Sequence, residues 1–146
     1  MTGPFVNHWA ANKLMSLPLP DPMRRALDLS AAAAIAGEVP VGAVITRDGV
    51  VIATAGNAMR QGVDPTAHAE IMAIRSAAAA LGSDRLDGCD LWVTLEPCAM
   101  CAGAISNARI ARLYYAASDP KGGGVEHGAR VFSHDTCHHR PEIYTG

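Results

Sequence analysis

The pattern of apolar and polar positions predicts that regular structure begins with a helix. Asp21 can act as its N-cap, Pro22 suits the first helical position, and Gly37 can end it. Three prolines and the lack of any period before this point predict an irregular lead-in over residues 1–21. The apolar residues at helical spacing in the predicted helix are Met23, Leu27, Ala31, Ala34 and Ile35.

Two short apolar segments, Gly42–Thr46 and Val50–Ala55, predict a pair of strands after this helix. Arg47, Asp48 and Gly49 separate them. An Asp-Gly pair between β-rich runs is a hairpin signal, because both turn residues must tolerate positive φ. We therefore expect these two strands to pair antiparallel.

The remainder of the chain alternates between helical and strand-like patterns. A second helix is predicted over residues 67–81, ended by Gly82, and its buried stripe would be Ile71, Ile74, Ala78 and Leu81. The later predicted elements are a strand at Leu91–Leu95, a helix over 98–107 after Pro97, a strand at Arg112–Ala117, a loop region opened by Lys121–Gly124 and a last strand at Glu142–Thr145. This order predicts an α/β fold with a mixed sheet of about five strands.

Length and composition restrict the class of protein. A chain of 146 residues has room for one domain with a substantial core, and 49% apolar with 18% charged residues is a soluble globular balance. No apolar run approaches the roughly 18–20 residues that span a bilayer, and the first twenty residues contain no secretory signal. A cytoplasmic protein without membrane contacts is the default expectation. The net charge of −2 indicates no global affinity for nucleic acid.

The cysteines carry the first chemical signal. In a reducing compartment four cysteines favour metal binding or catalysis over disulfides. Cys98 and Cys101 form a Cys-x-x-Cys pair at a predicted helix start, and such a pair alone is typical of a thiol redox site, half of a zinc site or inert structural cysteines. Cys89 is expected to be a small buried residue before the third strand.

His68 and Glu70 favour the zinc interpretation. With Cys98 and Cys101, His68 makes three protein ligands, and three ligands with one open position are the arrangement of a catalytic zinc site. Residues i and i+2 of a helix do not share a face, so Glu70 would reach the open position instead of ligating beside His68. A redox protein would leave His68 and Glu70 unexplained.

His-x-Glu followed by Pro-Cys-x-x-Cys is the signature of zinc-dependent nucleobase deaminases. The wider segments Glu38–Val44, Asn57, Asp64–Ile71 and Thr94–Ala104 resemble the bacterial tRNA-specific adenosine deaminases, within the cytidine/deoxycytidylate deaminase superfamily. The resemblance covers about residues 22–146, which we take as the zinc deaminase domain. It implies a three-layer α/β/α cytidine-deaminase-like fold and zinc-dependent hydrolytic deamination of the wobble adenosine of a tRNA anticodon to inosine.

The same resemblance implies roles for individual residues. His68, Cys98 and Cys101 match the ligands of one Zn²⁺ per chain, and Glu70 matches the proton shuttle. The positions that match substrate contacts are Asn57, Ala69 through its backbone, Asp119 and Lys121. The resemblance also implies a homodimer that binds the tRNA anticodon loop, and a final helix beyond the position of Gly146 that this sequence does not contain.

Two other functions stay open at this point. The first is a zinc deaminase acting on a free base or nucleotide, such as guanine, cytosine or a cytidine nucleotide, because the zinc core would be the same. The second is a non-catalytic zinc- and RNA-binding subunit, which would not need Glu70. His134, Cys137, His138 and His139 are interpreted as part of a polar loop and not as a second metal site.

Overall fold

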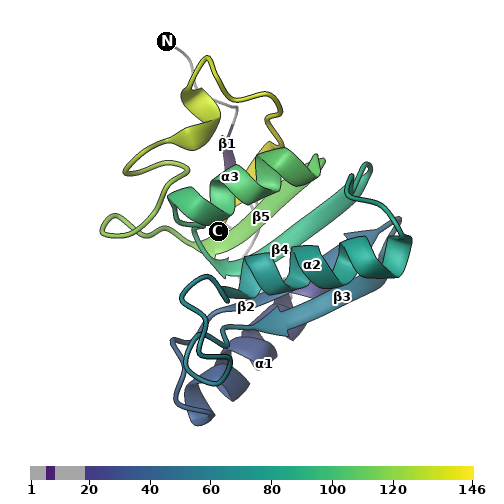
Figure 1. Cartoon of the computed structure of the whole chain (residues 1–146). Helices are drawn as coiled ribbons and strands as arrows, with labels where there is room; N and C mark the ends of the chain where they lie inside the picture. The colour runs from purple at the N-terminus through teal and green to yellow at the C-terminus, as the bar shows by residue number, and fades with distance from the viewer. Residues whose placement is uncertain (1–5, 9–18) are drawn as a thin grey trace.

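The computed structural model describes residues 6–8 and 19–146 (Figure 1). The helices are α1 (Asp21–Ile35), α2 (Ala69–Leu81) and α3 (Ala99–Ala108), with a 3₁₀ turn η1 at Val131–Ser133. The strands are β1 (Val6–His8), β2 (Gly42–Arg47), β3 (Val50–Gly56), β4 (Cys89–Leu95), β5 (Arg112–Ala117) and β6 (Glu142–Thr145). Within these described residues, none of the helices is long and apolar enough to span a membrane.

One mixed sheet organises the molecule, with the strand order β1-β6-β5-β4-β2-β3. Strand β2 pairs antiparallel with both β3 and β4, whereas β4, β5, β6 and β1 form successive parallel pairs. The hairpin prediction is confirmed: Arg47 pairs with Val50, and the two turn residues Asp48 and Gly49 have φ of 51° and 79°.

The predicted α/β fold with three layers is confirmed. Successive residues of a strand point to opposite faces of the sheet. In β2, Ile45 therefore packs in the main core under α2 and α3, while Val44 packs with Met23 of α1 on the other face. Figure 1 shows α2 and α3 together on one side of the sheet.

The start of the chain differs from its prediction. Val6–His8 form strand β1 beside β6, so an irregular lead-in is wrong for these three residues, and the sheet has six strands instead of about five. The other expected lead-in residues before Leu19 lie outside the described part. Asp21 is the first residue of α1 and not its N-cap, because the backbone places Pro20 in the cap position. The carboxylate of Asp21 accepts a 2.9 Å hydrogen bond from Arg24.

The buried faces of α1 and α2 also differ from their predictions. In α1, Met23, Ala26 and Ala33 are buried, whereas Leu27 is exposed and Ile35 is 90% exposed. In α2 the buried positions are small or acidic: Ala69, Glu70, Ala73 and Ala77. The predicted stripe residues Ile74, Ala78 and Leu81 pack against the core but are only partly buried. Gly82 ends α2 with φ of 63°, as predicted.

The carboxyl edge of the parallel strands collects the segments that carry the motifs. Asn57 directly follows β3, the segment Glu96–Cys98 follows β4, and Asp119 comes two residues after β5. Because β3, β4 and β5 all run in the same direction, these three segments meet at one edge. The last paired residues of β4 and β5 are Leu95 and Ala117.

Candidate active site

The three expected metal ligands lie together at this edge. Nδ1 of His68 is 3.6 Å from Sγ of Cys98 and 3.5 Å from Sγ of Cys101. All three ligand atoms lie within 4.8 Å of one another. In the described part of the chain they are the only group of three or more His, Cys, Asp or Glu side chains with such spacing. The structure therefore brings together residues from two segments about thirty positions apart.

Two helix starts hold these ligands. His68 is the N-cap of α2 and Cys98 the N-cap of α3, both with extended backbone and neither with a side-chain cap. Asp64 orders the turn before His68, because its Oδ1 accepts hydrogen bonds from the backbone N–H and the hydroxyl of Thr66. The positive ends of two helices thus face the cluster, where they favour thiolate over thiol.

The electrostatics of the two cysteines suit a metal. A hydrogen bond from the Cys101 thiol is the main reason that the pKa of Cys98 falls to about 5. The same contact, with burial, raises the pKa of Cys101. A divalent ion held by both sulfurs would replace the thiol proton and neutralise both thiolates. Two sulfurs and one imidazole nitrogen are a donor set that Zn²⁺ prefers, so the residues fit the ion.

Glu70 lies in the first turn of α2, two residues after His68. Its side chain is buried, with only 4% exposed, and it interacts with the thiol of Cys101. Burial raises the pKa of Glu70 above its ordinary value. A carboxyl group that is easily protonated and that faces the ligand cluster can accept and return protons there.

Asn57 and Ala69 are adjacent in the structure. The N–H of Ala69 donates a 2.7 Å hydrogen bond to Oδ1 of Asn57, and the amide group of Asn57 donates to the carbonyl of Val39. Asn57 is 6% exposed and Ala69 is fully buried. The asparagine thus ties the end of β3 to the start of α2, next to His68.

Asp119 and Lys121 lie in the loop after β5. Oδ1 of Asp119 accepts hydrogen bonds from the N–H groups of Lys121 and Gly122, which shapes a tight turn. Lys121 is exposed. The roles expected for these two residues, and for Asn57 and Ala69, stay predictions.

Sequence reasoning missed a buried acid beside the ligands. Glu96 is 3% exposed and accepts hydrogen bonds from the loop after β5, including one of 2.8 Å from Nδ1 of His127. Burial alone would raise its pKa, but the N–H of Asp119, the imidazole of His127 and further backbone N–H groups outweigh burial and lower the pKa of Glu96. The residue stands within the Thr94–Ala104 motif, yet no local pattern indicates a partner more than twenty residues away.

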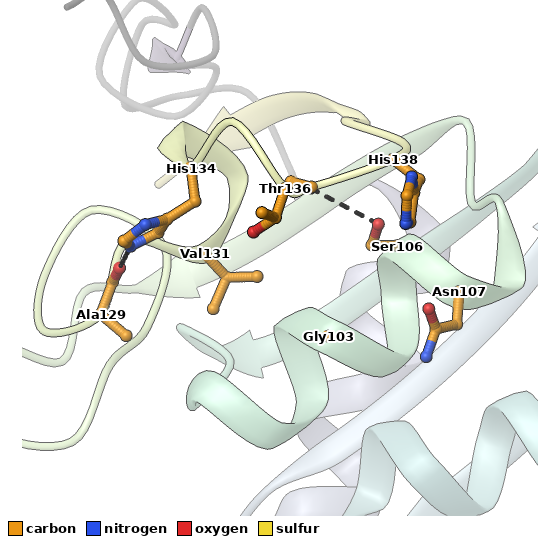
Figure 2. Close-up of a pocket in the computed structure, with 9 residues that line it drawn as sticks. Gly103, Ser106, Asn107, Ala129, Val131, His134, Thr136 and His138 are labelled. Atoms are coloured by element: carbon orange, nitrogen blue, oxygen red, sulfur yellow. Dashed lines mark hydrogen bonds between the residues drawn. The ribbon is translucent and has the colours of Figure 1, made fainter.

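The loop that carries the C-terminal histidines lies beside α3, and Figure 2 shows His134 and His138 on it. Nε2 of His134 donates to the carbonyl of Ala129 at 2.7 Å, and Nε2 of His139 donates to the carbonyl of Ile110 at 2.6 Å. A cavity of about 280 Å³ lies between this loop and α3, and its lining contains none of the metal-site residues. Cys89, as expected, is small and fully buried, although it begins β4 instead of preceding it.

The donor set of His68, Cys98 and Cys101, with a buried carboxylate beside it, fits a catalytic zinc site. Residues 20–117 match the cytidine and deoxycytidylate deaminase zinc-binding region. Because the match covers more than half of the chain, the protein belongs to this deaminase family.

Comparison with individual proteins shows which deaminases the chain is similar to. The chain is 64% identical over 109 residues to a tRNA-specific adenosine deaminase of Agrobacterium fabrum, covering 75% of this chain and 72% of that protein. A structure from a study of A-to-I editing by tRNA:A34 deaminases at the wobble position of transfer RNA superposes with a TM-score of 0.84 and 59% identity, covering 86% of this chain and 96% of that one. The structure of a guanine deaminase from Bacillus subtilis superposes with a TM-score of 0.67 and 44% identity. The match covers 70% of this chain and 66% of that one.

Proposed function

We propose that this protein hydrolyses the wobble adenosine of a tRNA anticodon to inosine and releases ammonia. The observation that carries the proposal is the buried carboxyl group of Glu70 against the His68, Cys98 and Cys101 cluster. The names of the similar proteins support the choice of substrate, because the relative at 64% identity is named a tRNA-specific adenosine deaminase and the structure at 59% identity comes from a study of tRNA:A34 deaminases. We further propose one zinc ion per chain, a cytoplasmic location and a homodimer.

The chemistry requires a nucleophile and two proton movements. A zinc ion held by the three ligands would supply Lewis acidity that brings the pKa of a water molecule close to neutrality. Glu70 accepts a proton from the attacking water and delivers it to N1 of the adenine ring, while the water oxygen bonds to C6. Glu70 then moves the remaining hydroxyl proton to the amino group. The C6–N bond breaks, ammonia leaves and the C6 carbonyl of inosine forms.

Substrate contacts would come from the surroundings of this cluster. The target base must leave its stack to reach the carboxylate, and a single-stranded anticodon loop makes that step inexpensive. Asn57 and the backbone of Ala69 would contact the flipped base, since they stand beside His68 and Glu70. Asp119 and Lys121 would approach the RNA around it, and the exposed Lys121 is suited to a phosphate.

A second candidate is deamination of a free base. The likeness to a guanine deaminase favours it, because the same zinc core accepts either substrate. The two functions differ in product and in substrate size, so one assay separates them.

The test is a comparison of substrates with the purified, zinc-loaded chain. A tRNA with adenosine at the wobble position, the same tRNA with guanosine there, free adenosine, guanine and cytidine are incubated separately, and the products are measured by mass. Inosine in the first tRNA alone is the expected result. Xanthine from guanine would move the assignment to free-base deamination. A zinc-loaded chain inactive on every substrate would contradict both candidates.

A further inference from the structure

The carboxylate of Glu96 joins two segments of the metal-site edge. It stands between β4 and α3, and all its hydrogen-bond donors come from the loop after β5. Oε1 accepts from the N–H of Asp119 at 3.0 Å and from Nδ1 of His127 at 2.8 Å. Oε2 accepts from the N–H groups of Val125, Glu126 and His127 at 3.0–3.1 Å. One buried side chain therefore gathers both ends of residues 119–127, which we call the substrate loop.

Two glycines let this loop approach the ligand segment closely. A Cβ atom on Gly123 would lie 2.3 Å from Oε2 of Glu96. A Cβ atom on Gly124 would lie 2.5 Å from the N atom of Ala99 and 2.8 Å from the carbonyl carbon of Cys98. The N–H of Gly124 also donates a 2.8 Å hydrogen bond to the carbonyl of Pro97. The loop thus rests directly on the backbone that carries a metal ligand.

The geometry points to Glu96 as a positioning residue that sets where Asp119 and Lys121 stand relative to the metal centre. Glu96 is separated from Cys98 by Pro97 alone, and its Oε1 accepts the backbone N–H of Asp119. Movement of this carboxylate would therefore move the substrate loop against the ligands. The inference rests on the proposed function, because the loop is expected to contact RNA.

Loss of this arrangement should affect substrate binding more than the chemical step. In Glu96→Gln one of the two acceptor atoms becomes an NH₂ donor that faces N–H groups, so several loop bonds are lost while the volume stays the same. His68, Glu70, Cys98 and Cys101 keep their own contacts. Displacement of a substrate-positioning segment by about 1 Å can cost about a hundredfold in rate. We expect kcat/KM for the tRNA to fall by about tenfold to a hundredfold, mainly through KM.

The matched control is Glu142→Gln. It makes the same chemical change at an exposed acid in β6, outside residues 119–127, and leaves every hydrogen bond to Glu96 in place. A second variant, Gly123→Ala, places a methyl group against Oε2 of Glu96. It therefore disturbs the hydrogen bonds of the Glu96 carboxylate to the loop and leaves every charge in place.

The experiment combines amide hydrogen exchange, zinc content and steady-state kinetics on the zinc-loaded protein. Faster exchange at residues 119 and 125–127 in Glu96→Gln and Gly123→Ala, with bound zinc retained and KM for tRNA raised relative to Glu142→Gln, supports the inference. Unchanged exchange, or an unchanged KM in a protein that edits tRNA, overturns it and leaves the proposed function intact. If the parent protein edits no RNA, the proposed function fails, and the exchange result still decides whether Glu96 orders the loop.

Discussion

The backbone N–H of Ala69 donates a 2.7 Å hydrogen bond to the side-chain oxygen of Asn57, twelve residues earlier in the chain. The bond satisfies a donor in the first turn of α2 that has no partner within the helix. It also holds the helix start that carries His68 against the end of β3. Asn57 is thus placed to affect both stability and catalysis.

Replacement of Asn57 by alanine should lower both the stability of the fold and the rate of deamination. The variant would leave the N–H of Ala69 buried without its partner, which costs about 1–3 kcal/mol of unfolding free energy. Urea denaturation measures this change, and inosine formation measures the accompanying loss of activity. Asn107→Ala, an exposed asparagine on α3, is the control and should lose little stability. Equal stability of the two variants would contradict the tethering role.

Glu70→Ala should retain zinc and fold but lose activity. Positioned acid–base catalysis contributes roughly 10²–10⁴-fold, so at least that factor should disappear from the single-turnover rate. Stability should not fall comparably, because burial disfavours the ionised form of this carboxyl group. Glu142→Gln changes an exposed acid in β6 and is the control. Normal turnover by Glu70→Ala would remove Glu70 from the mechanism.

Removal of the metal should abolish activity and make the two cysteines reactive toward alkylation, Cys98 more than Cys101. With a chelator in excess, Cys98 should be alkylated before Cys101, because Cys98 is partly exposed whereas Cys101 is fully buried. Mass spectrometry of peptides gives the order of modification. Zn²⁺ should restore activity to unmodified protein and Mg²⁺ should not, since thiolates bind the softer ion. Full activity at undetectable metal content would refute a zinc-dependent reaction.

Two glycine substitutions should have opposite effects on stability. A Cβ atom on Gly42 would lie 2.0 Å from the carbonyl oxygen of Ala26, so Gly42→Ala must push α1 away from β2 and should cost about 1–3 kcal/mol or more. Gly103 stands within α3 with open space around a Cβ atom, and Gly103→Ala should add about 0.5–1 kcal/mol. Thermal and urea denaturation at one protein concentration test both. A stable Gly42→Ala protein would show that the close contact of α1 with β2 is not required.

Asp90→Asn should stabilise the protein at neutral pH. Burial raises the pKa of Asp90 despite the nearby Arg112, and its Oδ1 atom is buried without a hydrogen bond. An acid whose folded pKa is raised contributes stability below its unfolded pKa, and that stability is lost as pH rises through the folded pKa. The gain should be a fraction of a kcal/mol, because a partly exposed charge is screened by solvent. The gain should shrink as the pH falls through the raised folded pKa of Asp90, and it should be absent below about 4, the ordinary aspartate pKa. A difference that is constant with pH would contradict this origin.

Local chemistry in the sequence determined much of this protein. Asp48-Gly49 predicted its hairpin because few other pairs accept positive φ at both positions. The order of helices and strands followed from their periods, and Arg112–Ala117 was predicted with its observed bounds. His68, Cys98 and Cys101 were recognisable because metal ligation restricts both residue type and spacing, and Glu70 because it completes the His-x-Glu part of the deaminase signature.

Other features depended on contacts between distant segments. The alanine-rich α1 has apolar residues around most of its circumference, so periodicity could not choose between the face of Met23 and that of Ile35. The close approach of Gly42 to Ala26 is part of the observed packing of α1 on β2, and only the folded chain shows it. Strand β1 becomes regular only through its partner β6, at the other end of the chain.

Glu96 shows the same difference between sequence and tertiary structure within the candidate active site. Its sequence position beside Pro97 and Cys98 shows an acid near a metal ligand and nothing of its partners. Four of those partners are backbone N–H groups, which every residue but proline carries and which therefore leave no mark on the sequence. The sequence by itself determined which atoms could bind the metal and move the protons. Only the tertiary structure decided what holds the surrounding loops against them, because that depends on where the chain returns in space.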